Sequence, residues 1–481
     1  MPIQINARMR MVLDLASRLA EDSYVVGGAV RDALMGRKSD ADLDLAVRGD
    51  GFSIAKDLAD FLGPEASFVP LDRDRGTGRV VLKGDDGGSV DISSFKGPDI
   101  FEDLRRRDFT INAVAVKISD MLQSGPAVLV DPLGGVADIE AKLVRICSGE
   151  AFPDDPLRIL RAFRFSSSLG LVITPETSAA VRESVGLIVN VAPERIRDEF
   201  IAVLACGSSI AALREMDRCG VLDVIFPELR PMKGCGQNAY HHLDVWSHTL
   251  EAVERFEWIT SRPHELFGVT EEIVASYLTE EAVTGRPRSA LLKLVILFHD
   301  SGKPAVRSVD AGGKVRFFGH EQVSRSIFLD ACGRMKLARR EMEIAAGLIE
   351  GHMRAMILTG DSVSKRAIHR LWRRFGNDLA GLLLIFLADL TAARGPARPV
   401  GEDERAFQRV RHVLEWFVDL QTCRPPLVNG HDLMGVLGLA PGPYLGWLLE
   451  HLAELRDNGE ITTKEEALSI AAALIRNNHP F

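Results

Sequence analysis

A pair of glycines between an apolar run and a helical pattern constrains this chain more than any other feature. Gly27 and Gly28 follow Tyr24-Val25-Val26, a run typical of a strand. Glycines permit a tight turn and a close approach of the backbone to a phosphate group. A helix N-terminus after the turn adds N–H donors and positive charge, and Arg31 in its first turn would face the same anion. The segment therefore predicts a turn that binds phosphate.

Two aspartates follow at alternate positions of a second predicted strand. Asp42 and Asp44 share one face because side chains alternate along a strand. Paired carboxylates can hold two Mg²⁺ ions, which activate a hydroxyl and neutralise a leaving pyrophosphate. Asp91, inside another apolar run, is a candidate third acidic group. A lone Gly-Gly is typical of any loop and a lone Asp-x-Asp of a solvated edge, but their order here favours phosphoryl transfer.

The first 146 residues have the pattern of an α/β domain. Four short apolar runs predict strands, and spacing of apolar residues predicts a helix over Ala7 to Leu19. From Pro156 onward helical patterns dominate. The predicted strands lie at 24–26, 43–47, 79–82 and 90–92, and the later predicted helices at Ala179 to Val189, Ala192 to Ala205 and Ile210 to Asp217. We therefore expect a mixed sheet with flanking helices, followed by an all-α remainder.

The chain of 481 residues is too long for one ordinary domain. Composition predicts a loop over residues 231–240 and a linker over 394–401, both rich in Gly and Pro. With the change of pattern near residue 146, these breaks predict four parts. We expect a head at 1–146, a helical neck at 147–230, a third domain at 235–395 and a helical tail at 402–481.

Four residues spaced by three surround the start of a predicted helix after Pro156. They are Asp155, Arg158, Arg161 and Arg164, which neighbour one another along a helix. Proline suits the first helical position and aspartate the cap. Asp155 can accept from an exocyclic amine and Arg158 can donate to a ring acceptor, a pattern that cytosine and adenine share. A capped helix with solvated arginines is the plain alternative, and both interpretations can hold together.

Histidines and aspartates gather in the third predicted domain. Imidazole and carboxylate together suit a transition-metal centre that activates water against phosphate esters. The alternative is a set of buried structural histidines. The candidate ligands are His248, His299, Asp300 and Asp389, with His320 and His352 as further members of the group.

Net charge and cysteine content limit which binding partners and which cellular compartment can be expected. The formal charge of −9 argues against nucleic acid, although local clusters such as Arg105 to Arg107 and Arg370, Arg373 and Arg374 can form basic patches. Six scattered cysteines without a Cys-x-x-Cys pair indicate reduced thiols. No run of 18 apolar residues and no export signal is present, so we expect a cytoplasmic protein without a membrane span.

The motifs together resemble class II tRNA nucleotidyltransferases and bacterial poly(A) polymerases over essentially the whole chain. The resemblance implies that Arg107, Asp108 and Asn112 hold the nucleotide sugar and phosphates, that Asp155 and Arg158 select CTP and ATP, and that Mg²⁺ binds Asp42 and Asp44. The third domain is similar to an HD phosphohydrolase domain with a divalent transition metal. The motifs that carry the resemblance are Gly27 to Asp32 with Asp42 to Asp44, Arg106 to Ala113, Asp131 to Asp138, Asp154 to Phe165, and Pro193 to Ile196 with Glu199.

Two departures from the family bear on the activity. Asp154 stands where the family usually has Glu. The segment after Asp91 is short, whereas relatives that add full CCA usually carry a longer loop there. The resemblance thus implies addition of CC to tRNA, with a separate A-adding enzyme as partner, or of full CCA by this chain alone. Poly(A) synthesis and a chiefly phosphohydrolase role remain alternatives.

Overall fold

The computed structural model describes residues 6–37, 42–84, 87–123, 128–283, 285–360, 363–421, 427–457 and 460–476. The chain forms two compact units, Met1–Ile225 and Phe226–Phe481. The four-domain division is finer than these two units and stays a prediction.

A seven-stranded mixed sheet forms the base of the first unit, with the order β3-β4-β5-β2-β1-β6-β7. Only the β2–β5 pair is parallel; the other neighbours run antiparallel. The parallel pair lies at the centre of the sheet, and it carries both Asp44 and Asp91. The strands are β1 Ser23–Val26, β2 Leu43–Val47, β3 Ala66–Asp72, β4 Thr77–Leu82, β5 Gly88–Ser94, β6 Ala115–Lys117 and β7 Leu129–Val130.

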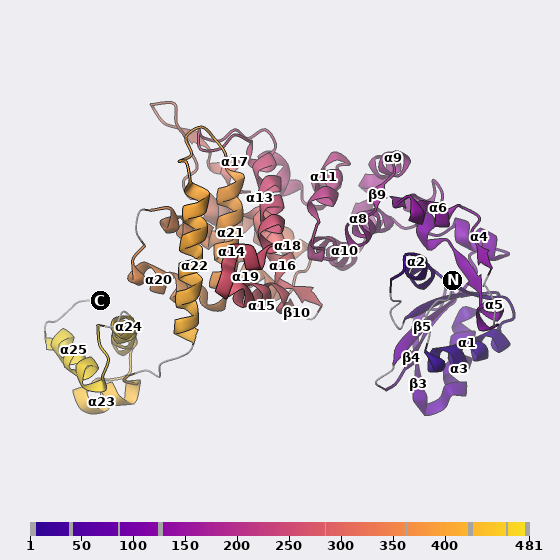
Figure 1. The fold of residues 1–481 in the computed structure, drawn as a ribbon, viewed down its shortest axis with the longest axis horizontal. Coiled ribbons are helices and arrows are strands. Elements are labelled where there is room, and N and C mark those ends of the chain that lie inside the picture. Colours follow the sequence, from indigo (N-terminus) through magenta and orange to yellow (C-terminus); the bar gives the residue numbers. More distant parts are fainter. Residues whose placement is uncertain are drawn as a thin grey trace. The chain divides into compact units, whose positions relative to one another are not determined.

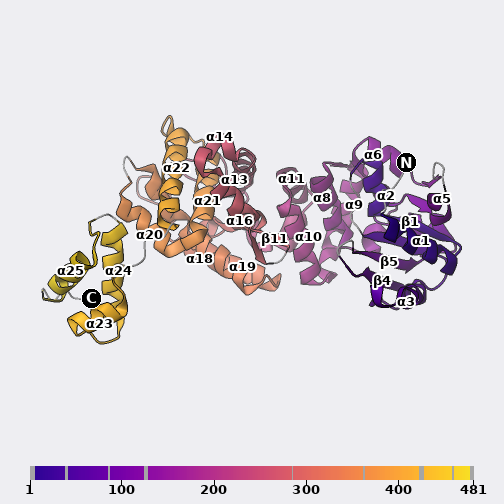
Figure 2. The ribbon, with the colours of Figure 1, turned by 60° about the horizontal axis from the view of Figure 1, so that its bottom comes forward.

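Helices cover one face of this sheet. The helices α1 (Ala7–Leu19) and α3 (Gly51–Leu62) pack against one another and α3 packs on β3, β4 and β5 (Figures 1 and 2). Leu45 of β2 and Ile92 of β5 point into this core and are fully buried. Because side chains alternate along a strand, Asp44 and Asp91 point to the opposite face. The sequence periodicity thus places the carboxylates on the side of the sheet away from α1 and α3.

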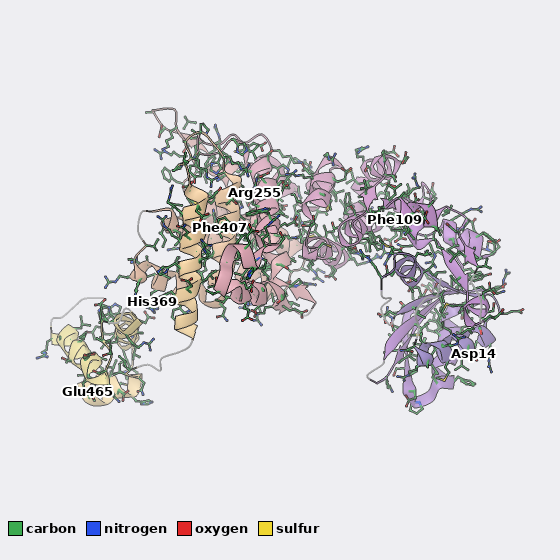
Figure 3. All side chains as sticks on the ribbon, in the orientation of Figure 1. Asp14, Phe109, Arg255, His369, Phe407 and Glu465 are labelled. Atoms are coloured by element: carbon green, nitrogen blue, oxygen red, sulfur yellow. The ribbon has the colours of Figure 1, made fainter. Side chains whose placement is uncertain are left out.

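The rest of the first unit is mainly helical. Phe109 is fully buried beside the rings of Phe152 and Phe165, at centroid distances of 6.5 and 5.7 Å (Figure 3). This aromatic cluster joins the segment after the sheet to helix α8. The helices are α2 Gly28–Leu34, α4 Ile100–Arg105, α5 Ile118–Leu122, α6 Gly135–Glu140, α7 Ala151–Asp154, α8 Arg158–Leu169, α9 Pro175–Ser184, α10 Pro193–Ala205, α11 Ile210–Arg218 and α12 Val221–Ile225, and two short strands pair as β8 Leu143–Val144 with β9 Val172–Ile173.

The second unit is helical apart from two short hairpins. Helix α21 is almost entirely buried and packs against α13. Phe407 of α22 packs beside Trp258 and Phe267 (Figure 3). The elements are α13 Val245–Thr260, α14 Pro263–Phe267, α15 Glu271–Thr279, β10 Glu281–Val283, β11 Arg286–Pro287, α16 Arg288–Phe298, α17 Lys303–Val306, β12 Ser308–Val309, β13 Val315–Arg316, α18 His320–Arg334, α19 Arg339–Gly351, the 3₁₀ helix η6 His352–Thr359, α20 Lys365–Phe375, α21 Leu379–Ala392, α22 Glu402–Gln421, α23 Gly430–Leu437, α24 Pro443–Asp457 and α25 Lys464–Arg476.

One stretch, Lys365–Ala392, has the length and the mean hydropathy, 1.5, of a membrane span. However, 72 % of its apolar window is buried inside the structure. Its apolar character is accounted for by the contacts of α21 in the core of the unit. The helices α23, α24 and α25 share a separate apolar core that includes Leu433, Leu448 and Ala467.

Most of the expected elements are confirmed. The four strands and the helices over 7–19, 192–205 and 210–217 agree with the structure to within a few residues. The helix expected over Ala179 to Val189 begins earlier, at Pro175, because the Thr174 side chain accepts from the backbone N–H of Thr177 and caps it. It ends at Ser184 and continues as a 3₁₀ turn.

The predicted linker at 394–401 has no helix or strand, but it packs against another segment of the second unit. The Gly395 N–H donates to the carbonyl oxygen of Tyr240, and a Cβ at Gly395 would lie 2.3 Å from the Ala239 carbonyl oxygen. Glycine is required at this position because only its backbone fits so close to another segment. The two segments that composition predicted as separate loops therefore pack together.

Candidate functional site

Gly27 brings the end of β1 against the first candidate catalytic carboxylate. Its φ is +73°, and a Cβ at this position would lie 2.9 Å from Asp44 Oδ2 and 3.6 Å from Arg107 Nη1. Strand pairing sets this approach, because Val26 lies opposite Asp44 in the register of β1 and β2. Two features therefore favour glycine at position 27. Its φ is positive, and the contact with Asp44 leaves no room for a side chain.

The three candidate carboxylates of the sheet have different surroundings. Asp44 and Asp91 lie opposite each other on β2 and β5. Arg79 donates to both oxygens of Asp91 at 2.6 and 2.8 Å. Asp42 precedes β2, and its Oδ1 accepts from the Ser89 N–H and hydroxyl at 2.9 and 2.8 Å. Asp42 and Asp91 are thus each held by neighbours of their own.

Asp44 differs from the other two because no hydrogen bond or ion pair reaches its carboxylate within the described part of the chain. Desolvation by the surrounding walls raises the pKa of Asp44, and the charge of Arg107 opposes that effect. The carboxylate nevertheless faces the solvent of an open cavity. An unpaired, desolvated carboxylate beside two further acids is suited to Mg²⁺, which prefers oxygen ligands. Among the described residues, the three are not drawn into one coordination sphere.

A polar chain links the predicted nucleotide-binding residues behind Asp44. Arg31 Nη1 donates to Asn112 Oδ1 at 2.9 Å, and Asn112 Nδ2 donates to Asp108 Oδ1 at 3.1 Å. Arg161 donates twice to Asp108 Oδ2, at 3.0 and 2.7 Å. Burial favours the neutral form of Asp108, but the charge and hydrogen bonds of Arg161 prevail and lower its pKa. These contacts fix the arginines that the sequence analysis selected.

Phe165 brings three of those arginines together. The guanidinium carbons of Arg31, Arg161 and Arg164 lie 5.2, 5.3 and 4.5 Å from its ring centroid. Arg164 Nε also donates to Glu199 Oε2 at 2.6 Å. A cavity of about 250 Å³ opens here beside Gly27 and Gly28. Its grouped cations suit a polyphosphate. The spacing by three that selects the arginines passes over Phe165, although it stands next to Arg164 in the same motif.

A larger cavity of about 1160 Å³ joins the carboxylates to the predicted base-selecting residues. Asp155 lines it and accepts from Arg195 Nη2 at 3.3 Å. Arg158 is buried and donates to three backbone carbonyls, those of Ala151, Arg106 and Arg107 at 3.1, 3.1 and 3.4 Å. Asp44, Asp91, Asp108 and Arg161 line the same cavity, whereas Asp42 does not.

The helix that carries these arginines begins later than expected. Its first turn is made by i→i+3 bonds from Arg158 N to the Asp155 carbonyl and from Ile159 N to the Pro156 carbonyl. Helix α8 therefore starts at Arg158 instead of Pro156. Asp155 still supports this turn, because its Oδ1 accepts from the Leu157 N–H at 3.2 Å. The N-cap of α8 is Leu157, without a side-chain cap, so the predicted start at Pro156 with Asp155 as cap was wrong by two residues.

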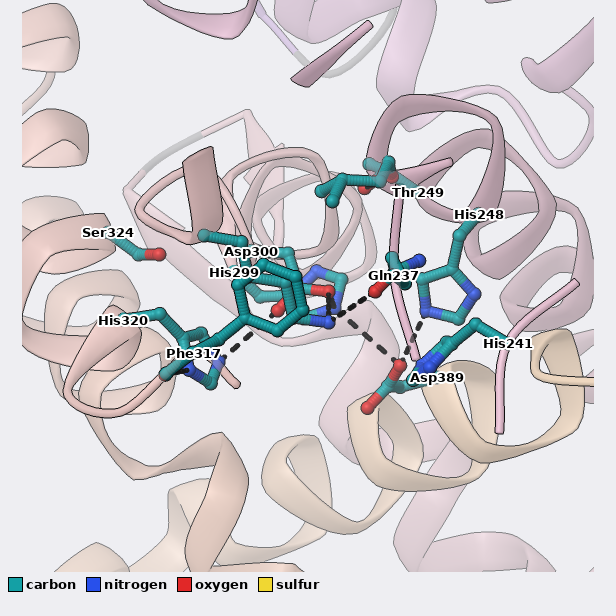
Figure 4. A network of polar contacts seen from close by, with 12 residues as sticks. Gln237, His241, His248, Thr249, His299, Asp300, Phe317, His320, Ser324 and Asp389 are labelled. Atoms are coloured by element: carbon teal, nitrogen blue, oxygen red, sulfur yellow. Dashed lines mark hydrogen bonds and ion pairs between the residues drawn. The ribbon is translucent and has the colours of Figure 1, made fainter. Parts of the chain in front are cut away.

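In the second unit the four predicted metal ligands converge (Figure 4). His248 Nε2 lies 2.7 Å from Asp389 Oδ1, and His299 Nε2 lies 3.2 Å from Asp300 Oδ2. Two histidines outside that predicted core adjoin it, since His320 and His352 form a second group with Asp300. Within each group all candidate ligand atoms lie within 4.8 Å of one another. The sequence marked both histidines, but only the fold places them beside Asp300.

The carboxylates of this cluster are surrounded by imidazoles and by one lysine. His299 Nε2 and Asp300 Oδ2 have no hydrogen bond of good geometry, and Lys303 Nζ lies 2.6 Å from the same oxygen. Burial disfavours the charged imidazole, yet Asp300 and Asp389 raise the pKa of His299 to about 10. Burial lowers the pKa of His352 to about 3. This set of nitrogen and carboxylate ligands fits a divalent transition metal.

Comparison with known proteins places this architecture in a family. Residues 23–145 match the model described as the Poly A polymerase head domain, and residues 170–233 match the probable RNA- and SrmB-binding site of polymerase A. An A-adding tRNA nucleotidyltransferase of Deinococcus radiodurans is 35 % identical, over 92 % of this chain and 93 % of that protein. A CC-adding tRNA nucleotidyltransferase of Geobacter sulfurreducens is 32 % identical, over 95 % and 93 %.

The fold agrees as well. The structure of the Thermotoga maritima CCA-adding enzyme complexed with tRNA has a TM-score of 0.65 and 21 % identity, over 98 % of this chain and 96 % of that one. The match with the Deinococcus protein covers 449 residues. This chain belongs to the class II tRNA nucleotidyltransferases of the poly(A) polymerase superfamily.

Proposed function

We propose that this chain adds C residues to the 3′ ends of tRNA, with CTP as donor. The observation that carries the proposal is the close approach of the Gly27 turn to Asp44. Asp44 lines two cavities, and both are also lined by arginines. The 3′ oxygen of the tRNA forms a bond to the α-phosphorus of CTP, the bond from that phosphorus to pyrophosphate breaks, and the hydroxyl proton passes to solvent. Mg²⁺ on Asp42 and Asp44, when bound, would activate the hydroxyl and neutralise the pyrophosphate.

The arginines around Phe165 would bind the triphosphate. Arg31, Arg161 and Arg164 carry the charge, and Gly27 and Gly28 leave their backbone open to the phosphates. Arg107 Nη2 is held by Asp103 at 3.1 Å and lies between the two cavities. We assign the sugar to Asn112 and Asp108, whose polar chain connects to Arg31.

Asp155 and Arg158 would read the base. A guanidinium has five N–H donors, and Arg158 uses three of them on backbone carbonyls. The remaining donors are enough for the ring acceptor of cytosine, while Asp155 accepts from its amino group. The backbone contacts would hold the guanidinium in place, so the protein itself would act as the template.

The short connection between β5 and α4 supports C addition. Strand β5 ends at Ser94 and α4 begins at Ile100, so five residues, 95–99, join them. Family members that complete CCA usually carry a longer loop at this place. A separate A-adding enzyme would then finish the tRNA. A addition is the second candidate, because the relative at 35 % identity is described as A-adding.

One assay separates these activities. Transcripts of tRNA that end at the discriminator base, after the first C and after the second C are each incubated with labelled CTP or ATP. The proposal predicts incorporation from CTP on the first two substrates and none from ATP on the third. Incorporation of A on the third substrate would contradict the CC-only assignment, and long A tracts would indicate a poly(A) polymerase. Asp42→Ala and Asp44→Ala should both abolish transfer.

A second function is favoured by the cluster around Asp300. A cavity of about 890 Å³ opens onto Asp300, His320 and His352 and is also lined by Lys303 and Arg316. We propose that this cavity binds organic phosphate esters and hydrolyses them with a divalent metal. Hydrolysis of p-nitrophenyl phosphate by Asp44→Asn protein reloaded with Mn²⁺ or Ni²⁺ tests this. Activity that survives Asp300→Asn would contradict the assignment.

The compartment and the domain roles complete the proposal. Five described cysteines are free, and Cys423 lies outside the described residues. Reduced thiols fit a cytoplasmic enzyme. We assign the nucleotide to the head at 1–146 and neck at 147–230, the metal to 235–395, and RNA contacts to the tail at 402–481.

A further inference from the structure

Lys96 stands at the start of the short connection that joins β5 to α4, and its backbone is held in place. The Phe95 N–H donates to the Val47 carbonyl oxygen at 2.9 Å, and the Lys96 N–H donates to Asp103 Oδ1 at 3.0 Å. The other oxygen of Asp103 accepts from Arg107 Nη2 at 3.1 Å. One buried carboxylate thus fixes both the backbone of Lys96 and the side chain of Arg107.

The side chain of Lys96 lines the cavity of about 1160 Å³ together with Asp44 and Asp91. Its ammonium has no hydrogen bond and no ion pair within the described part of the chain. Arg73, another cation of this wall, lies over the ring of Phe52. The remaining arginines of the wall are held by carboxylates or backbone carbonyls, and they are Arg75, Arg106, Arg107, Arg158, Arg161 and Arg195.

The charges around Lys96 favour the binding of an anion. Desolvation by the cavity walls lowers the pKa of Lys96, the charges of Arg158 and Arg107 act in the same direction, and Asp103 opposes them. Asp103 is already paired with Arg107 at 3.1 Å. An anion beside Lys96 would relieve the repulsion among the three cations, and lysine binds phosphate as a compact point charge.

Two cavities meet at Asp44, and their walls differ. Gly27 and Arg31 line only the smaller one, where we place the triphosphate, whereas Lys96 and Asp91 line only the larger one. In phosphoryl transfer the attacking oxygen and the leaving group lie roughly in line, on opposite sides of the phosphorus. With the pyrophosphate in the smaller cavity, the 3′ oxygen of the tRNA approaches from the larger one. The RNA anion nearest to that oxygen is the phosphodiester of the same terminal nucleotide.

We propose that Lys96 binds the phosphodiester on the 5′ side of the 3′-terminal nucleotide of the tRNA and thereby places the 3′ hydroxyl beside Asp44. The inference rests on the proposed transfer to tRNA and names a residue that binds its acceptor. Because Asp103 already holds the backbone of Lys96, only the lysine side chain has to be ordered when the RNA binds.

A chemical change in the RNA tests this contact directly. Two tRNAs that end after the first C are assembled, one with an ordinary terminal linkage and one with a neutral methylphosphonate there. Binding to the full chain is measured by fluorescence anisotropy without CTP, and KM is measured with labelled CTP. We expect Lys96→Gln to raise the Kd and the KM of the ordinary tRNA at least about 10-fold and to leave the KM for CTP unchanged. The methylphosphonate should weaken binding by the wild type to a similar extent, and Lys96→Gln should weaken it no further.

Lys56→Gln is the matched control, because Lys56 is exposed on α3 and lines neither cavity. This variant should bind both RNAs as the wild type does, and Lys96→Arg, which keeps the charge, should lose less affinity than Lys96→Gln. An unchanged Kd in Lys96→Gln, or an equal further weakening of the methylphosphonate RNA, would overturn the contact. So would a raised KM for CTP with an unchanged KM for tRNA. A wild-type chain that binds tRNA but adds no C would contradict the proposed function, and the binding measurements would still decide the role of Lys96.

Discussion

Gly27 lies so close to Asp44 that a Cβ on the glycine would be 2.9 Å from the aspartate Oδ2. This contact joins the phosphate-binding turn to the carboxylate that the proposed transfer requires. A side chain at Gly27 would therefore displace Asp44 or Arg107, and the same substitution would strain a backbone with φ of +73°.

Gly27→Ala should nearly abolish nucleotide transfer while the protein still folds. The backbone of Gly27, with φ of +73° and ψ of −135°, lies in a sparsely populated region that costs alanine about 1–3 kcal/mol, which a folded domain tolerates. Gly36→Ala is the matched control, because Gly36 has φ of +68° and nothing within 4 Å of its Cβ position. Both variants should lose similar free energy of unfolding, but only Gly27→Ala should lose kcat. Equal activity in the two variants would contradict the role of the contact.

Asp44→Asn should inactivate the enzyme and yet raise its thermal stability in the presence of chelator. The folded protein raises the pKa of Asp44, so folding disfavours the ionised form and this carboxylate destabilises the protein at neutral pH. A neutral amide removes that cost. The gain should vanish in acid, where the carboxyl is protonated in both states.

Asp91→Asn is the comparison for this experiment, because it breaks two charged contacts with Arg79. It should leave the midpoint of thermal unfolding equal or lower. A lower midpoint for Asp44→Asn than for Asp91→Asn at pH 7 would contradict the expected sign.

Asp108→Asn should destabilise the protein by about 1–3 kcal/mol at neutral pH, since it removes the charged partner that Arg161 contacts at 2.7 Å and leaves the longer contact with Glu199 at 3.9 Å. The folded protein lowers the pKa of Asp108. Its contribution to stability is therefore fully present above the ordinary carboxyl pKa, near 3.9, and is lost as the pH falls through the lower folded value. Urea unfolding at a series of pH values checks this. A difference between wild type and variant that grows on acidification would contradict it.

The sequence predicted the parts of the site that depend on local pattern. Alternation along one strand predicted a shared face for Asp42 and Asp44, with Asp91 as a candidate third acid. The structure places Asp42 just before β2 and pairs Asp44 with Asp91 on neighbouring strands. The Gly-Gly turn predicted that the backbone can approach another group closely, and it does approach Asp44. Spacing on one helix likewise selected Arg158, Arg161 and Arg164. These features follow from the regular spacing of side chains along strands and helices, which can be read directly from the sequence.

Contacts between distant segments were not predictable in this way. Arg79 reaches Asp91 through the antiparallel pairing of β4 and β5, and no motif marks it. Arg158 was expected to donate to the ring acceptor of a base, and no motif marks the additional contacts of its guanidinium with the carbonyl oxygens of Arg106 and Arg107, which lie about 50 residues away in the chain. His320 and His352 acquire a common partner in Asp300 only after three segments pack. Tertiary packing alone decides such neighbours.

Phe165→Leu should raise the KM for CTP with little change in stability. The leucine keeps an apolar side chain on α8 but removes the ring that Arg31, Arg161 and Arg164 contact. One cation–π contact contributes about 0.5–2 kcal/mol, so a loss of arginine positioning equivalent to one contact would raise the KM roughly 2- to 30-fold. Phe163→Leu, a fully buried neighbour on the same helix, controls for packing. A similar KM in both variants would show that the ring does not organise the arginines.

Helix α20 should contact tRNA despite the net charge of −9. Its eleven residues, KRAIHRLWRRF, include five basic side chains and no acidic one, and Lys365 and Arg370 are exposed. We expect Lys365→Glu with Arg370→Glu to raise the KM for tRNA and to leave the KM for CTP unchanged. Each lost phosphate contact should also reduce the slope of log KM against log salt concentration by about 1.

Arg339→Glu with Arg340→Glu provides the charge-matched control, because both arginines are exposed on α19 and Arg339 pairs with its helical neighbour Glu343. This variant should keep the tRNA KM and its salt slope. If both variants weaken tRNA equally, net charge alone explains the effect and α20 has no specific role. If neither variant weakens tRNA binding, α20 does not contact the tRNA phosphates. The arginines of α8 then become the main candidates for those contacts.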